Sequence, residues 1–118
     1  MTQTFFVPGP LPNVNDIAGK NRWSYGKTKK TWTQRIATLA LVARIKPVDR
    51  AVFAFEWREK DRRRNPDNIA GGGKKLIFDG LVTAHVIAND GWGQVAGWSD
   101  SFAVDAANPG VWVTLTSA

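Results

Sequence analysis

The chain contains no cysteine, only one histidine and no long uninterrupted apolar run. Without cysteine there is no disulfide framework and no thiolate metal site, which is typical of a reducing compartment, so we expect a cytoplasmic protein. No segment approaches the roughly 20 apolar residues that a membrane-spanning helix needs. The first residues also lack a basic leader followed by an apolar stretch. We therefore expect neither secretion nor contact with a membrane.

The residues that are present favour a folded, basic domain. The 118 residues are 43% hydrophobic and include six tryptophans and six phenylalanines, which is enough for one domain, 1–118, with its own core. Sixteen basic and ten acidic residues leave a net charge of +6. This charge favours a polyanionic partner such as DNA or RNA. Many basic proteins bind no nucleic acid, so the charge alone leaves that question open.

The periodicity of apolar residues predicts four strands and two helices. Residue alternation predicts the strands Thr4–Val7, Ala51–Trp57, Gln94–Val104 and Val111–Thr116, the first at a sheet edge. Three- and four-residue spacing predicts the helices Lys30–Ile45, ended by Pro47, and Gly73–Ala84. The polar stretch from Asn13 to Tyr25 is expected to be a surface loop. This order predicts an α/β fold, in which two helices cover a small mixed β-sheet.

A charged motif lies in the middle of the chain. Three arginines, Arg62 to Arg64, directly precede Asn65-Pro66-Asp67-Asn68, and a glycine run, two lysines, Asp79 and Asp90 follow. Arginines neutralise phosphates, and carboxylates can hold a divalent metal that activates water and stabilises charge on phosphorus. The combination predicts a metal-dependent phosphodiesterase.

Each part of this motif also has a structural interpretation. An arginine run is often a solvated turn, Asp67 and Asn68 could cap a helix, and Asp90 lies in a turn sequence. The glycine run, Gly71–Gly73, lacks the pattern of a phosphate-binding loop, so we interpret it as flexible spacing. His85 has no matching metal partner and fits the end of a helix.

The tryptophans divide into two groups. Four lie within expected elements and are interpreted as packing residues: Trp32, Trp57, Trp98 and Trp112. Trp23 and Trp92 fall in expected loops, where they could stack on splayed bases or wedge a DNA junction open. Burial in the core or in an interface is an equally good explanation for those two.

The run Arg62 to Asn68, followed by Lys75, Phe78-Asp79-Gly80-Leu81 and Asp90, resembles the signature of the RusA-type Holliday junction resolvases, especially their phage and prophage branch. The early loop from Pro8 to Asn13 and the outer elements are similar as well, so the resemblance covers nearly the whole chain. It implies a RusA-like homodimer that binds four-way or branched DNA. It also implies a magnesium-dependent endodeoxyribonuclease, with manganese as a possible substitute, that makes paired nicks in phage DNA recombination, repair, replication or packaging.

The resemblance also implies roles for individual residues. Asp67, Lys75 and Asp90 become the catalytic residues, with the two aspartates as metal ligands. Asp79 lies one helical turn after Lys75 and could complete the metal site or orient the ammonium group. Lys74 could replace Lys75 as the catalytic lysine. The expected DNA-binding residues are Arg62, Arg63, Arg64, Lys74, Lys20, Arg22, Lys29 and Lys30.

Asn65 departs from the family pattern, which commonly has an aspartate at this position. As a metal ligand, its amide oxygen would bring no negative charge, so the metal would bind more weakly. The alternative function is therefore a branched-DNA-binding protein with little or no nuclease activity.

Overall fold

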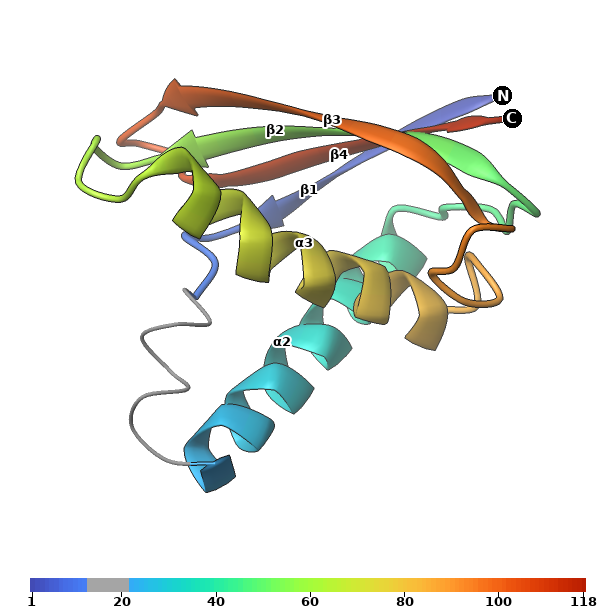
Figure 1. Cartoon of the computed structure of the whole chain (residues 1–118), viewed down its shortest axis with the longest axis horizontal. Helices are drawn as coiled ribbons and strands as arrows, with labels where there is room; N and C mark the ends of the chain where they lie inside the picture. Colours follow the sequence, from blue (N-terminus) through green and yellow to red (C-terminus); the bar gives the residue numbers. More distant parts are fainter. Residues whose placement is uncertain (13–21) are drawn as a thin grey trace.

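The computed structural model describes residues 1–12 and 22–118, without the side chains of residues 22–25. The elements are β1 (Thr2–Pro8), α2 (Arg22–Val42), β2 (Ala51–Glu59), α3 (Pro66–Thr83), β3 (Val95–Val104) and β4 (Gly110–Ser117). Figure 1 shows both helices on the same side of one sheet. This arrangement confirms the predicted α/β class with two helices and a small sheet. In the described part of the chain, no helix is long and apolar enough to cross a membrane.

The sheet is mixed, as predicted. Its strand order is β1-β4-β2-β3, so β1 lies at an edge and β3 at the other. β2 runs parallel to β3, whereas β4 is antiparallel to both β2 and β1. β3 and β4 follow each other in sequence but are separated by β2 in space. The parallel pair requires a crossover connection, which α3 provides.

The core lies between the sheet and the helices. Phe53, Phe55 and Trp57 alternate along β2 and are buried, which confirms that they share one face. Phe78 of α3 meets the rings of Phe53 and Phe55 edge to face, at centroid distances of 5.1 and 5.7 Å. Such aromatic contacts add to the hydrophobic free energy that holds a helix on a sheet.

α3 begins seven residues earlier than predicted, at Pro66 instead of Gly73. Pro66 occupies the first turn, where a missing backbone N–H does no harm. The glycine run is therefore helical, and its interpretation as flexible spacing is wrong. Gly73 faces the indole of Trp57, because a Cβ at residue 73 would lie 2.7 Å from the Trp57 ring. Packing has overridden the low helix propensity of glycine.

α2 also differs from the prediction at both ends. It begins at Arg22, although the residues up to Tyr25 were expected to form a loop. Apolar periodicity reports burial rather than helicity, so it misses a helix segment such as residues 26–30, none of which is buried. The helix ends at Val42 instead of Ile45 because Arg44 adopts a left-handed conformation with φ of 59°. Ile45 then donates its N–H to the carbonyl of Ala40 at 3.0 Å and closes the helix end.

Gly71 and Gly73, two of the glycines of α3, give a matched test of this packing. A Cβ at Gly71 would meet no atom within 4 Å. We expect Gly71→Ala to raise the free energy of unfolding by up to about 1 kcal/mol, because alanine favours helix over glycine by that amount. Gly73→Ala should lower it by roughly 1–3 kcal/mol through overpacking against Trp57. Thermal unfolding of both variants checks this, and equal effects of the same sign would contradict it.

Candidate functional site

Lys75 is held between two aspartates, and we call Lys75, Asp79 and Asp90 the Lys75 cluster. The ammonium Nζ lies 2.8 Å from Oδ2 of Asp90 and 3.3 Å from Oδ1 of Asp79. Asp79 follows Lys75 by one turn of α3, which confirms that the two share a helix face. Asp90 comes from the connection between α3 and β3. The structure therefore brings together three of the residues that the sequence singled out.

The turn that carries Asp90 has a fixed backbone. The side-chain oxygen of Asn89 accepts the Gly91 N–H at 2.8 Å. The carbonyl of Gly91 in turn accepts the N–H groups of Gln94 and Val95, at 3.2 and 3.0 Å. These bonds tie the turn to the start of β3. Asp90 thus reaches Lys75 from a defined position.

The cluster shifts the pKa values of two of its members. The hydrogen bond from Lys75 lowers the pKa of Asp90, and the hydrogen bond to Asp90 is the main reason why the pKa of Lys75 is raised. Burial opposes both shifts but is outweighed. Lys75 is consequently protonated and Asp90 ionised at neutral pH. The Lys75 side chain is still 56% exposed, so the ammonium can reach a ligand from solvent.

A groove of about 570 Å³ lies between α2 and α3 beside the cluster. Lys29 and Lys30 line it together with Asp79, Asn89 and Asp90. Lys29 Nζ lies 3.5 Å from Oδ2 of Asp79, which is an ion-pair distance. The same buried Oδ2 atom makes no hydrogen bond within the described residues. The groove therefore combines lysines expected to bind DNA with a carboxylate whose buried Oδ2 atom makes no hydrogen bond to the described residues.

Lys74 and Lys75 have different surroundings, although they are adjacent in sequence. The Lys74 side chain is only 14% exposed, and its ammonium lies 2.7 Å from Oδ2 of Asp100. It also sits over the Trp98 ring, 4.6 Å from the centroid. Lys74 thus packs between α3 and β3. Because its ammonium is already paired with Asp100, this arrangement does not support the expected contact of Lys74 with DNA. Lys75 is the lysine that meets the aspartates.

Asp100 is a charged residue beside the site that no sequence pattern had indicated. One of its carboxylate oxygens accepts the indole N–H of Trp57 at 2.8 Å, and the other binds Lys74. Asp100 lies on β3 directly opposite Phe55 of β2 in the parallel register. No local pattern reveals such a pairing, since the register of a parallel strand pair depends on the whole crossover.

Asn65 and Asp67 lie at the other end of α3. Asn65 is the N-cap residue but makes no side-chain cap bond, and Asp67 accepts the N–H of Asn68 at 3.0 Å. Eight residues separate Asp67 from Lys75, which in a helix is about 12 Å along the axis. The structure does not bring these two residues to the Lys75 cluster, so their metal role stays a prediction. Among residues 1–12 and 22–118, no three acidic or histidine side chains form a metal-binding group.

Asp79 and Asp90 are the two carboxylates of the Lys75 cluster that could hold a magnesium ion. Both carboxylates lie within 3.3 Å of the same nitrogen atom, and one oxygen of Asp79 has no hydrogen-bond partner in the described structure. Magnesium is commonly held by one or two carboxylates, with water and substrate phosphate as the remaining ligands. Of the four residues predicted to hold Mg²⁺ or Mn²⁺, Asp79 and Asp90 lie together at the Lys75 cluster, whereas Asn65 and Asp67 lie at the other end of α3.

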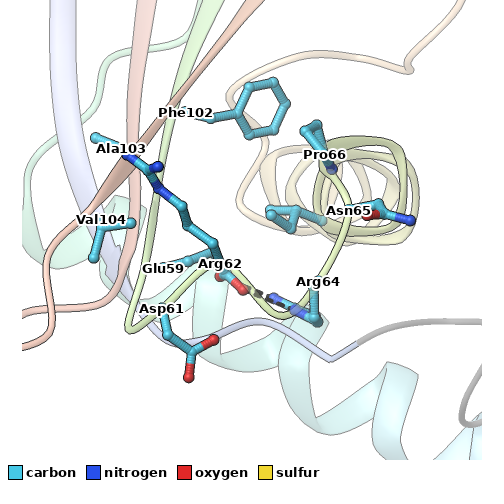
Figure 2. A pocket seen from close by; sticks show the side chains of 10 residues that line it. Glu59, Asp61, Arg62, Arg64, Asn65, Pro66, Phe102, Ala103 and Val104 are labelled. Carbon is cyan, nitrogen blue, oxygen red and sulfur yellow. Dashed lines mark hydrogen bonds and ion pairs between the residues drawn. The ribbon is translucent and has the colours of Figure 1, made fainter.

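The three arginines also separate in space. Arg64 binds both oxygens of Glu59, at 2.8 and 2.9 Å, and the carbonyl of Leu11 at 2.9 Å. Figure 2 shows this pair at one side of a cavity of about 270 Å³, opposite Phe102 and Pro66. Arg64 is thus a structural residue, whereas Arg62 and Arg63 are exposed and available to phosphates. Lys20 lies outside the described residues, as does the side chain of Arg22.

Two comparisons with known proteins bear on the identity of the chain. No protein-family model matches it, and no curated protein gives a significant match. The functional interpretation therefore depends on the chemistry of the Lys75 cluster and the groove beside it.

The pKa shifts predict how the cluster contributes to stability. Asp90 has a lowered pKa in the folded state, so its contribution is present above the ordinary value of 3.8 and is lost as the pH falls below it. We expect Asp90→Asn to lower the free energy of unfolding at pH 7 by less than about 1 kcal/mol, because the pair is partly exposed. Urea unfolding at pH 7 and pH 3 checks this. A difference from the wild type that does not shrink between pH 7 and pH 3 would contradict the ion-pair explanation.

Proposed function

We propose that this protein is a metal-dependent endodeoxyribonuclease of the RusA type that acts on branched DNA. The observation that supports this most is the position of Lys75 between Asp79 and Asp90, beside a groove with two further lysines. A lysine next to paired carboxylates is suited to phosphodiester hydrolysis. The net charge of +6 adds a long-range attraction for DNA. Such an enzyme would act in the cytoplasm of a bacterial host, on phage or prophage DNA.

Each residue of the cluster has a defined task in this proposal. The Lys75 ammonium contacts the scissile phosphate and stabilises the negative charge that develops in the transition state. Asp79 and Asp90 would hold Mg²⁺ or Mn²⁺, which supplies activated water and neutralises charge on phosphorus. Lys29 and Lys30 contact phosphates on the groove side, and the exposed Arg62 and Arg63 do so at the other end of α3. The 18 residues of α3 span about 27 Å, enough to reach several phosphates.

We further propose that the enzyme works as a homodimer. Two sites related by a two-fold axis would match the approximate symmetry of a four-way junction and give paired nicks. The edge strand β3 offers a surface for the second copy, because Trp98, Phe102 and Val104 are half-exposed large apolar residues on its helix-facing side. We call these three residues the β3 strip. In the described sheet, the outer side of β3 has no strand neighbour.

A branched-DNA-binding protein without nuclease activity is the second candidate. It is favoured by the separation of Asn65 and Asp67 from the Lys75 cluster and by the lack of charge on Asn65. With only two carboxylates, the metal would bind weakly. The lysines and exposed arginines would still bind DNA.

Cleavage of a labelled synthetic four-way junction tests the proposal. We expect symmetric cuts in the junction with Mg²⁺ or Mn²⁺, no cuts in a matched linear duplex and none with chelator. Asp90→Asn and Lys75→Met should each slow cutting by about 100-fold or more, because each removes charge stabilisation at the reacting phosphate. Junction affinity of Asp90→Asn should be unchanged or higher, since a carboxylate that repels phosphate is gone.

One outcome discriminates between the candidates, and another locates the metal site. Junction binding without cutting in either metal would favour the binding protein. Asp67→Asn is the matched control on the same helix: retained cutting would restrict the metal site to Asp79 and Asp90, whereas lost cutting would extend the site to the N-terminal end of α3.

The dimer proposal predicts a separate result. Phe102→Glu places a charge in the β3 strip, and we expect it to shift the protein to a monomer in analytical ultracentrifugation and to uncouple the paired nicks. Val52→Glu is the control, since Val52 is equally exposed but lies on the opposite face of the sheet. A wild-type monomer at concentrations that bind junctions would refute the dimer. Equal behaviour of the two variants would instead show that the interface lies elsewhere.

A further inference from the structure

Trp92 is 95% exposed, more than any other large hydrophobic residue described. Tryptophan is highly buried on average because of its large apolar surface. The Trp92 ring makes no aromatic or cation–π contact with another described residue. Ring contacts are made by Trp57 and Trp112, and cation–π contacts by Trp32 and Trp98. From the sequence alone, Trp92 could either pack in a core or an interface or stack on DNA bases. Packing within the described protein is now excluded.

The ring projects from a rigid turn. The Asn89 side chain and the Gly91 carbonyl fix the backbone immediately before and after Trp92. Gly93, which follows it, has open space around its Cα, since an added Cβ would meet no atom within 4 Å. A ring on a fixed backbone loses little conformational entropy when it binds a flat ligand, which favours a binding role.

The surroundings of Trp92 fit nucleic acid better than protein. The same turn supplies Asp90 to Lys75, and the groove with Lys29 and Lys30 begins at Asn89 and Asp90. Aromatic rings beside a basic track are the common design of single-strand binding sites. The residues nearest in sequence are polar or glycine, namely Asn89, Asp90, Gly91, Gly93 and Gln94. Protein interfaces instead need a continuous apolar centre, as the β3 strip has.

We propose that Trp92 stacks on the exposed face of a nucleobase at the branch point of the DNA, beside the phosphate held at Lys75. This inference rests on the proposed function. In a continuous duplex both faces of each base are covered by neighbouring pairs, so no base face is free for the ring. A branch point offers unstacked bases. Trp92 would thereby select branched over linear DNA, independently of the charge contacts.

Binding of fluorescent DNA with chelator present, so that no strand is cut, tests this role. We expect Trp92→Ala to weaken binding of a four-way junction on the order of 10-fold, the usual loss for one base–aromatic stack. Affinity for a linear duplex should not change, and Trp92→Phe should keep most of the junction affinity. Leu41→Ala is the control, because it removes another exposed apolar side chain, 61% exposed, near the distant end of α2.

A junction without bases at the branch point makes the test specific. Wild type should bind this abasic junction as weakly as Trp92→Ala binds the intact one, and the two changes together should add little. The slope of log affinity against log salt should be the same for Trp92→Ala and wild type, because stacking releases no counterions. Lys30→Ala should reduce that slope by about one unit.

Three results would overturn the inference. Equal junction affinity of Trp92→Ala and wild type would refute stacking while leaving the nuclease proposal intact. A change in oligomeric state with Trp92→Ala would assign the ring to a protein interface. Absence of any DNA binding by the wild type would refute the proposed function, and the stacking role with it.

Discussion

The close packing of α3 between the sheet and α2 is the constraint on which the candidate site depends. Gly73 lets the helix approach Trp57 of β2, and Gly80 lets it approach α2, where a Cβ would lie 2.7 Å from Cβ of Ile36. With both sides in contact, the helix can neither rotate nor slide without a clash. Its rotation decides that Asp79 faces the groove and that Lys75 lies beside Asp79, and its length decides where the turn with Asp90 begins. The two glycines thus act on the chemistry through geometry alone.

The same constraint separates two adjacent lysines. The side chains of neighbouring residues in a helix point about 100° apart, so only one of Lys74 and Lys75 can face Asp79 and Asp90. Lys74 turns toward β3 and joins Asp100 and Trp57 in a network that satisfies the indole N–H. An unpaired indole N–H would be costly in this core. Lys74 therefore has a structural role and Lys75 a candidate catalytic role, although they are neighbours on α3. Both roles depend on the same rotation of this helix.

Much of the fold could be predicted from the sequence, but only part of the site. Alternation along β2 and the four-residue spacing of Lys75 and Asp79 are local patterns, and both are confirmed. The glycine run was mistaken for a flexible spacer because its packing partner, Trp57, lies in another element. That error mattered for the site, since a flexible run would let Asp67 reach Asp90, whereas a continuous helix holds Asp67 about 12 Å from Lys75. Asp100 was not predicted for a related reason: its position beside Lys74 and Trp57 depends on the register of β3 against β2, which no local sequence pattern determines.

The charges of the site are balanced within the protein. Asp79 and Asp90 face two cations, Lys75 and Lys29, so ion pairs with described side chains balance the charge of both carboxylates. The fold does not need a metal ion to offset these two negative charges. A DNA phosphate that binds either lysine changes this balance, because it competes with a carboxylate for the same ammonium group. The released carboxylate would then have a higher affinity for a divalent cation. Under the proposed function, phosphate and metal should therefore favour each other's binding at this site, and metal binding would depend on the presence of DNA rather than on the stability of the fold.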